Sequence, residues 1–161
     1  FDAIDAREVI RGVARLILLR LSPRISLEVA VPEGLTLVRG SQRKLAQILL
    51  NLLLNASEAL EDASIEKPTI RIAAIGNYGG VRIDVTDNGP GISSEVMEKL
   101  FQPFVTTKGS TNAAGLGLSL AQEDARSFGA TLTAQNNEQG GATLSLHLRS
   151  LGMTGEHPAV H

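Results

Sequence analysis

Cysteine and tryptophan are absent from the 161-residue sequence, and aromatic residues make up only 3% of it. Without cysteine the chain forms no disulfide, no thiolate zinc site and no cysteine nucleophile, which fits a reducing compartment. A cytoplasmic domain is therefore expected, and its parent protein is free to be membrane-bound. With so few aromatic rings, the core has to be built from Leu, Ile, Val and Ala, and 43% apolar residues suffice for one compact domain.

Charge of one sign and long apolar runs are scarce too. The 15 basic and 17 acidic side chains give a formal net charge of −2, without the basic bias of a nucleic-acid-binding protein. No apolar run is long enough to span a bilayer, and no signal peptide heads the sequence. We therefore expect no nucleic-acid partner and no direct membrane contact by this domain. The P-loop, the six-residue dinucleotide fingerprint and the eukaryotic-type protein-kinase motifs are also missing.

Apolar residues recur at both helical and alternating spacing, which favours an α/β domain. A capping box at Asp5 predicts a first helix that ends near Leu21. Ser41 is placed to cap a long helix. Its predicted buried face comprises Leu45, Ile48, Leu49, Leu52, Leu53, Ala56 and Leu60. We expect further helices over 93–100 and 116–128, strands over 25–31, 35–38, 69–75, 81–86, 130–135 and 142–148, and an irregular segment over 101–114.

Turn residues predict how neighbouring strands are joined. Pro32-Glu33-Gly34 separates the strands 25–31 and 35–38, so a β-hairpin is expected there. The glycine-rich turn 76–80 joins the next two strands. From Ser150 onward we expect a flexible tail.

The sequence Asp87-Asn88-Gly89-Pro90-Gly91 follows the predicted strand 81–86. It places a carboxylate at a strand end beside glycines, which allow another molecule to approach the backbone closely. This pattern indicates a binding pocket. The alternative is a turn-forming aspartate that satisfies its own backbone.

A polar stripe runs along the long helix. Asn51, Asn55, Glu58 and Asp62 fall at helical spacing on one side of a helix otherwise rich in leucine. An asparagine oxygen suits Mg²⁺, which usually keeps several waters and takes its other oxygens from nucleotide phosphates. The alternative is an ordinary solvated helix face.

The glycine-rich segment 109–118 contains Gly115-Leu116-Gly117-Leu118 at the head of a predicted helix. Glycines there let phosphate oxygens reach free backbone N–H groups, where the helix dipole also favours negative charge. Alternatively the segment is only a flexible connection.

The order of these motifs is more specific than any one of them. The chain reads Asn-Leu-Leu-Leu-Asn-Ala from Asn51, Asp-Asn-Gly-Pro-Gly from Asp87, Phe-Gln-Pro-Phe from Phe101, Thr-Thr-Lys from Thr106, Gly-Leu-Gly-Leu from Gly115 and Gly-Gly-Ala-Thr from Gly140. Over about residues 1–149 it strongly resembles the catalytic, ATP-binding domain of bacterial sensor histidine kinases, with their N, G1, F and G2 boxes. Thr-Thr-Lys is most similar to the nitrogen-regulation type.

The resemblance implies a Bergerat ATP-binding fold. This is an α/β (α+β) two-layer sandwich, a mixed sheet of about five strands covered on one face by three main helices. The domain would occupy residues 1–149, and the tail 150–161. Nucleotide would lie between the helices and a lid, away from the open face of the sheet.

The resemblance also implies roles for individual residues. Asp87 accepts a hydrogen bond from the exocyclic amine of adenine, which selects ATP over GTP because guanine presents an acceptor there. Gly89 and Gly91 let the backbone wrap the base, and the Thr143 hydroxyl assists Asp87 through water; a strand threonine is otherwise only structural.

Asn55 is implied as the Mg²⁺ ligand, with Asn51 one turn earlier in a supporting catalytic role. The lid and the start of the last helix close over the triphosphate through Lys108, Gly115, Leu116, Gly117 and Leu118. Phe101 and Phe104 match the F box, where the resemblance implies that they pack the lid against the body of the domain or against a partner domain; core filling is the competing explanation for both. The family pattern is broken at Glu58, where a basic residue is common, and at Ser41, where an acidic one is frequent.

The expected reaction is transfer of the γ-phosphoryl group of ATP to a histidine. His147 lies in a predicted strand, and His157 and His161 lie in the tail, so none fits the acceptor. We expect the acceptor on a separate dimerisation domain of the parent protein, with a response regulator downstream. The chain alone should bind ATP and barely phosphorylate itself.

Three alternatives remain. ATP-hydrolysing relatives of the gyrase, chaperone and mismatch-repair type carry a glutamate base where this chain has Asn51, which cannot take a proton. Anti-sigma serine kinases match the short length but are not expected to carry the segment 101–108. A degenerate interaction module would have kept the fold and lost nucleotide binding. The joint presence of Asn55, Asp87, Gly91 and Gly117 argues against it.

Overall fold

The computed structural model describes residues 2–61, 64–77, 79–102 and 113–151, and of residues 113–117 the backbone alone. In chain order these residues form β1 (Asp2–Ile4), α1 (Ala6–Leu18), β2 (Ser26–Ala30), β3 (Val38–Gly40), α2 (Gln42–Glu61), β4 (Thr69–Asn77), β5 (Gly80–Asp87), α3 (Ser94–Lys99), α4 (Ala113–Ser127), β6 (Thr131–Asn136) and β7 (Ala142–Arg149).

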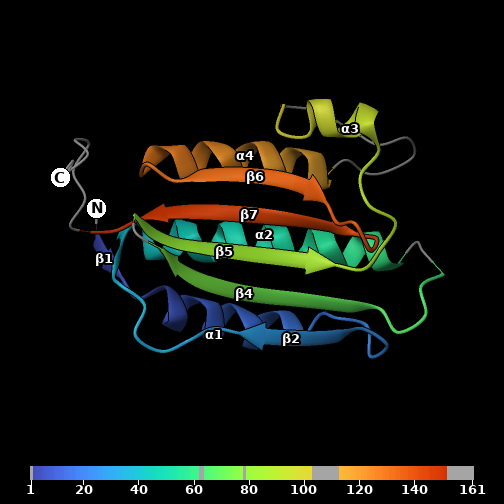
Figure 1. The fold of residues 1–161 in the computed structure, drawn as a ribbon, viewed down its shortest axis with the longest axis horizontal. Helices are drawn as coiled ribbons and strands as arrows, with labels where there is room; N and C mark the ends of the chain where they lie inside the picture. The colour runs from blue at the N-terminus through green and yellow to red at the C-terminus, as the bar shows by residue number, and fades with distance from the viewer. Residues whose placement is uncertain (1, 62–63, 78, 103–112, 152–161) are drawn as a thin grey trace.

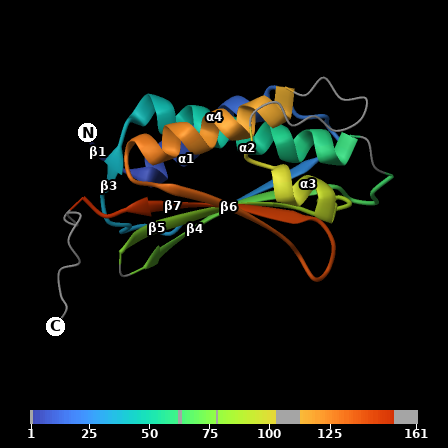
Figure 2. The ribbon, with the colours of Figure 1, turned by 90° about the horizontal axis from the view of Figure 1, so that it is seen from above.

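A five-stranded sheet in the order β2-β4-β5-β7-β6 forms one layer of the domain (Figure 1). β2 is parallel to β4, and the other neighbouring strands are antiparallel, so the sheet is mixed. The helices α1, α2 and α4 form the second layer on one face of this sheet (Figure 2). The expected two-layer fold with three main helices is confirmed.

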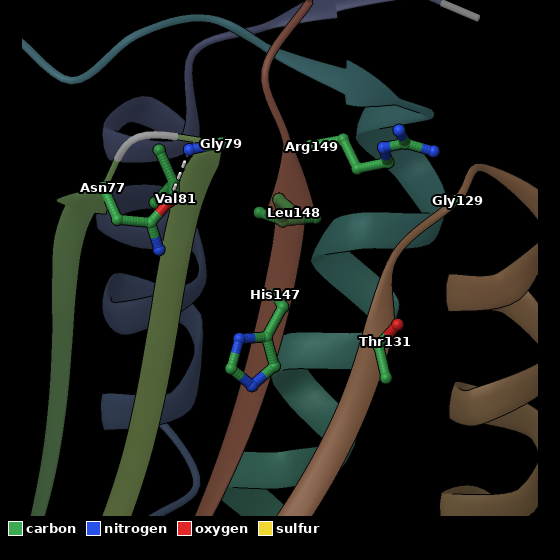
Figure 3. Close-up of a pocket in the computed structure, with 8 residues that line it drawn as sticks. All are labelled: Asn77, Gly79, Val81, Gly129, Thr131, His147, Leu148 and Arg149. Atoms are coloured by element: carbon green, nitrogen blue, oxygen red, sulfur yellow. Dashed lines mark hydrogen bonds between the residues drawn. The ribbon is translucent and has the colours of Figure 1, made fainter. Parts of the chain in front are cut away.

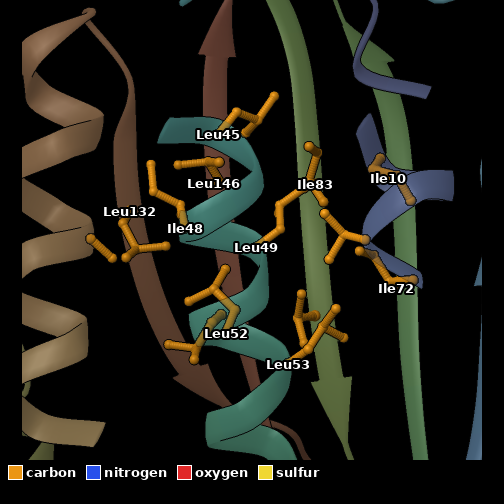
Figure 4. Packing of buried hydrophobic residues seen from close by; sticks show 14 of the residues in the cluster. Ile10, Leu45, Ile48, Leu49, Leu52, Leu53, Ile72, Ile83, Leu132 and Leu146 are labelled. Carbon is orange, nitrogen blue, oxygen red and sulfur yellow. The ribbon is translucent and has the colours of Figure 1, made fainter. Parts of the chain in front are cut away.

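The core lies between α2 and the sheet. All seven residues of the predicted buried face of α2 are buried. They pack against apolar side chains that point inward from the strands, among them Ile72, Ile83 and Leu146 (Figure 4). Burying one such side chain contributes about 1.5–3 kcal/mol, so α2 is the main contributor to the packing of this layer.

Side-chain caps set the starts of three helices. The Asp5 carboxylate accepts a hydrogen bond of 3.0 Å from the Arg7 N–H. Ser41 and Ser93 each accept one of 3.2 Å from the N–H three residues ahead. Because such caps satisfy N–H groups that have no partner within the helix, these helices begin where the sequence predicts.

The hairpin expected around Pro32-Glu33-Gly34 is wrong. β2 pairs in parallel with β4, with Ser26 opposite Thr69, and residues 35–37 form no strand. β3 instead pairs with β1 in a separate two-stranded sheet, with Ile4 opposite Val38. The chain leaves the main sheet after β2 and returns only after α2, and a local turn signal carries no information about such a crossover.

The first two residues after β7 are held by backbone hydrogen bonds to other parts of the chain. The Ser150 N–H donates to the Gly79 carbonyl at 2.8 Å, and the Leu151 N–H donates to the Leu37 carbonyl at 2.9 Å. The rest of the expected tail lies outside the described residues. Within the part of the chain that the structure describes, no helix combines the length and apolarity needed to cross a membrane.

Candidate functional site

Several of the predicted segments meet at one end of the sheet. β5 ends at Asp87 where β7 begins, and Asn136 at the end of β6 lies opposite Ala142. The Lys44 ammonium, near the start of α2, lies 3.4 Å from the Ser127 hydroxyl at the end of α4. The two helices are therefore antiparallel, and the start of α4 turns toward the half of α2 that carries Asn55 (Figure 1).

The Asp87 carboxylate is at the centre of this end. The residue is 8% exposed, and strand alternation places its side chain on the helix-covered face with those of Ile83 and Val85. The Gly89 N–H donates to its Oδ1 at 2.8 Å. Burial raises the pKa of Asp87, and the backbone N–H groups of Gly89 and Ala142 partly oppose that rise.

This geometry is compatible with both interpretations of Asp87, a turn-forming aspartate and a carboxylate that binds a ligand. The bond from Gly89 is the local turn interaction that the alternative reading expects. An ionised carboxylate has about four lone-pair positions, so acceptor capacity remains for a donor from outside the chain. A buried carboxylate with a raised pKa and spare acceptor capacity is a candidate binding group.

Gly89 connects Asp87 with α2. It is buried, and a Cβ atom built on it would lie 3.0 Å from the Asp87 Oδ1 and 3.5 Å from the Ala59 carbonyl oxygen. Ala59 is four residues after Asn55, on the same side of α2. The predicted base-binding loop therefore lies against the turn of α2 that follows the predicted metal ligand, Asn55.

Asn51 and Asn55 border the buried face of α2. Both are half-buried, and between them Leu52 and Leu53 enter the core. An asparagine oxygen in this position suits Mg²⁺, a hard cation that takes oxygen ligands. Elsewhere in the described ranges, no group of three or more His, Cys, Asp or Glu side chains forms an alternative metal site. Glu58 is exposed, and Asp62 lies outside the described residues.

Thr143 and the Asp87 carboxylate lie on opposite faces of the sheet, so the assistance through water that the resemblance implies stays a prediction. The Thr143 Oγ1 donates to the Asn137 Oδ1 at 2.7 Å and lies 3.0 Å from the Thr86 Oγ1, on the open face of the sheet. Its neighbour Ala142 is buried on the helix-covered face, and the Ala142 N–H is one of the two backbone groups that lower the pKa of Asp87. Because side chains alternate along a strand, an offset of one residue reverses the face.

Gly141 is a site residue that the sequence reasoning did not single out. Its φ of +88° is one that glycine adopts readily, and a Cβ atom there would lie 1.9 Å from the Asp87 carbonyl oxygen. The pair Gly140-Gly141 before a predicted strand was the available signal. Gly91, which was predicted, has a φ of +85°.

The predicted phosphate-binding segment is only partly described. Gly115, Leu116 and Gly117 lie in the first turns of α4, which begins at Ala113 rather than at Leu116. The Leu118 side chain is 2% exposed and belongs to the core, and its role in the site stays a prediction. Phe101 packs partly buried against the core, as the competing explanation expects. Phe104 and Lys108 lie outside the described residues.

A separate hollow of about 380 Å³ lies at the other end of the sheet (Figure 3). Val81 at the start of β5 and Leu148 near the end of β7 are among its lining residues. His147 also lines it, and its Nε2 lies 3.3 Å from the Thr133 hydroxyl. This hollow is therefore distinct from the site around Asp87.

Comparison with known proteins gives consistent matches. A family model described as "Histidine kinase-, DNA gyrase B-, and HSP90-like ATPase" matches residues 40–151. The C4-dicarboxylate transport sensor protein DctB of Rhizobium meliloti is 36% identical over 146 residues, 89% of this chain and 22% of that protein. The sensory histidine kinase/phosphatase NtrB of Rhizobium leguminosarum bv. phaseoli is 32% identical over 129 residues, 73% of this chain and 33% of that protein.

The chain thus spans about a fifth to a third of the length of these relatives. Among solved structures, the catalytic domain of histidine kinase ThkA in a nucleotide-free form matches with a TM-score of 0.79 at 29% identity, covering 93% of this chain and 95% of that one. Histidine kinase ThkA in complex with the response regulator protein TrrA matches with a TM-score of 0.76 at 28% identity, covering 93% of this chain and 42% of that one.

Proposed function

Because the chain belongs to the histidine kinase-, DNA gyrase B- and HSP90-like ATPase family, we propose that it binds Mg-ATP and donates the γ-phosphoryl group to a protein histidine. Its relatives are sensor histidine kinases, NtrB among them, so the resemblance of the sequence to their catalytic domains is confirmed. The acceptor histidine would lie on a separate dimerisation domain of the same parent protein.

The observation that carries this proposal is the buried Asp87 carboxylate at the end of β5, next to the half of α2 that bears Asn55. The exocyclic amine of adenine donates to the carboxylate, whose Oδ1 the Gly89 N–H already orients. Guanine would present a carbonyl oxygen at that position and leave two acceptors facing each other. The site therefore favours ATP over GTP.

The residues around the phosphates position the nucleotide and offset its charge. The Asn55 amide oxygen, with Asn51 in support, is suited to hold Mg²⁺ beside the phosphate oxygens. When bound, that ion neutralises charge on the phosphates. In α4, which begins at Ala113, the Gly115 N–H lies in the first turn and has no carbonyl partner within the helix, so it is free to donate to a phosphate oxygen. Gly117, two residues further on, is proposed to let the phosphates approach the helix closely. Lys108 is proposed as a further cationic contact.

Transfer to a protein acceptor is favoured over hydrolysis. Hydrolysis needs a base to activate water, and an asparagine at position 51 cannot accept a proton. His147 faces the hollow at the far end of the sheet, so it is not the acceptor. A response regulator is the proposed downstream partner, supported by the ThkA structure solved with one.

A calorimetric titration of the chain with Mg-ATP tests the proposal, followed by incubation with labelled ATP, with and without a separately prepared domain that bears the acceptor histidine. We expect binding, almost no label on the chain alone, and label on the added domain. Steady ATP hydrolysis without an acceptor would favour the ATPase alternative. An absence of ATP binding would favour the interaction module.

A further inference from the structure

Asn136, the last residue of β6, holds the loop that follows Asp87. Its Nδ2 donates to the Ile92 carbonyl oxygen and its Oδ1 accepts from the Ile92 N–H, both at 2.8 Å. A Cβ atom built on Gly91 would lie 3.0 Å from the same Oδ1. One side chain thus satisfies both backbone groups of Ile92, and glycine at position 91 lets the loop come this close.

The loop is held at its other end as well. The Asn88 Oδ1 accepts from the Thr69 N–H at 2.8 Å, and its Nδ2 donates to the Lys67 carbonyl at 3.0 Å. Between these two anchors lie Gly89 and Pro90, with the Gly89 N–H on the Asp87 carboxylate. The segment 88–92, which orients Asp87, is therefore held by the side chains of Asn136 and Asn88, rather than by helix or strand hydrogen bonds.

Asn136 contributes little to the core, because it is exposed. Its bonds reach Ile92, 44 positions away in the chain. Ile92 follows β5, and β7 lies between β5 and β6 in the sheet. Because the side chain is exposed and both its amide oxygen and its amide nitrogen bond Ile92, it stabilises the loop more than the fold as a whole.

We infer that Asn136 is a positioning residue for nucleotide recognition: it keeps residues 88–92 in the conformation that presents Asp87 and the glycine backbone to the base. This inference rests on the proposed function. Without the clasp the loop samples other conformations, and binding has to order it again, which weakens affinity. Because the loop faces the base, the loss applies equally to ATP and ADP.

Gln122 provides a matched control. Its Nε2 donates to the Leu132 carbonyl at 3.0 Å and its Oε1 accepts from the Leu132 N–H at 3.2 Å. Gln122 makes the same pair of hydrogen bonds, but its side chain is 7% exposed and its bonds go to β6 rather than to the loop 88–92. The Gln122→Ala substitution should therefore lower stability more than Asn136→Ala and leave the nucleotide affinity of the folded chain unchanged.

The test measures the Kd of Mg-ATP and Mg-ADP by calorimetry, the thermal midpoint, and the exchange rate of the Ile92 amide by NMR. For Asn136→Ala we expect about 10-fold weaker binding of both nucleotides, faster Ile92 exchange and a small change in the midpoint. Asn136→Asp keeps the acceptor for the Ile92 N–H and loses the donor to the Ile92 carbonyl. Its nucleotide affinity should therefore lie between those of the unsubstituted chain and Asn136→Ala.

An Asn136→Ala chain that exchanges Ile92 faster and still binds both nucleotides as the original does would overturn the inference and leave the proposed function standing. Equal affinity losses in Asn136→Ala and Gln122→Ala would also overturn it, because the effect would then follow general stability. If the unsubstituted chain binds neither nucleotide, the proposed function fails and the inference fails with it.

Discussion

A Cβ atom built on Gly141 falls 1.9 Å from the carbonyl oxygen of Asp87. No L side chain fits there unless the β6–β7 turn moves away from the end of β5. Gly141 therefore allows the start of β7 to lie against the strand end that carries the Asp87 carboxylate, where the Ala142 N–H lowers the pKa of that group. Close backbone contact at this point is a condition for the site geometry.

The Gly141→Ala substitution should lower the free energy of unfolding by about 2 kcal/mol or more, since it adds a steric clash to an unfavourable φ. Gly140→Ala is the matched control: its φ is +103°, and a Cβ there meets nothing within 4 Å. Only the backbone cost of about 1–2 kcal/mol should apply to it. Urea unfolding of both variants measures the difference, and equal losses would contradict the steric argument.

The Asp87→Asn substitution should weaken ATP binding about 10- to 100-fold, the usual effect of losing one hydrogen bond to a charged group. Stability should be kept, because an asparagine oxygen still accepts from the Gly89 N–H and the buried charge is gone. Asp84→Asn is the control on the same strand. Asp84 accepts from the Ser145 hydroxyl at 2.7 Å on the open face, so calorimetry should find its ATP affinity unchanged. Unchanged binding in Asp87→Asn would refute the adenine assignment.

The pH dependence of ATP binding should report the raised pKa of Asp87. Adenine's amine donates to the ionised carboxylate, so affinity should fall as the pH drops through that pKa, and binding near it should release protons. Stability changes in the opposite sense: the unfolding free energy of the chain relative to Asp87→Asn should decrease as the pH rises through the raised pKa. Calorimetry in buffers of different ionisation enthalpy detects the proton release, and a release that persists in Asp87→Asn would assign it to another group.

The Asn55→Ala substitution should remove the gain in ATP affinity that Mg²⁺ provides, because it deletes the proposed oxygen ligand. The measurement is the ratio of ATP affinities in Mg²⁺ and in EDTA, which should fall toward unity. Gln47→Ala removes an exposed amide from the same helix and should keep the original ratio. A Mg²⁺ dependence that survives in Asn55→Ala would place the metal ligand elsewhere.

Much of the architecture follows from local patterns. The buried face of α2 repeats with the helical period, and that period depends only on helix geometry. Asp5, Ser41 and Ser93 cap helices because each bonds an N–H two or three residues ahead. The bond from the Gly89 N–H to the Asp87 carboxylate is equally local, because it spans two residues. These features could be predicted without knowledge of the tertiary structure.

Other features depend on which segments meet. The turn at Pro32-Glu33-Gly34 predicts a hairpin, yet β2 pairs with β4, which arrives only after α2. The motif that ends in Thr143 does not tell which residue of β7 shares a face with Asp87, and the pleat places Thr143 on the open face with Thr86. Neither the strand partner nor the strand register is encoded in a short window.

By itself, the sequence determined where the helices and most strands lie, which α2 residues are buried, and that Asp87 and Asn55 are the residues to examine. The tertiary structure decided that Ala142 and Gly141 adjoin Asp87, and that Asn136 clasps Ile92, 44 residues away. The physical reason is the range of the interactions. Periodicity and capping act within a few residues, whereas contacts between strand ends exist only once the sheet has assembled.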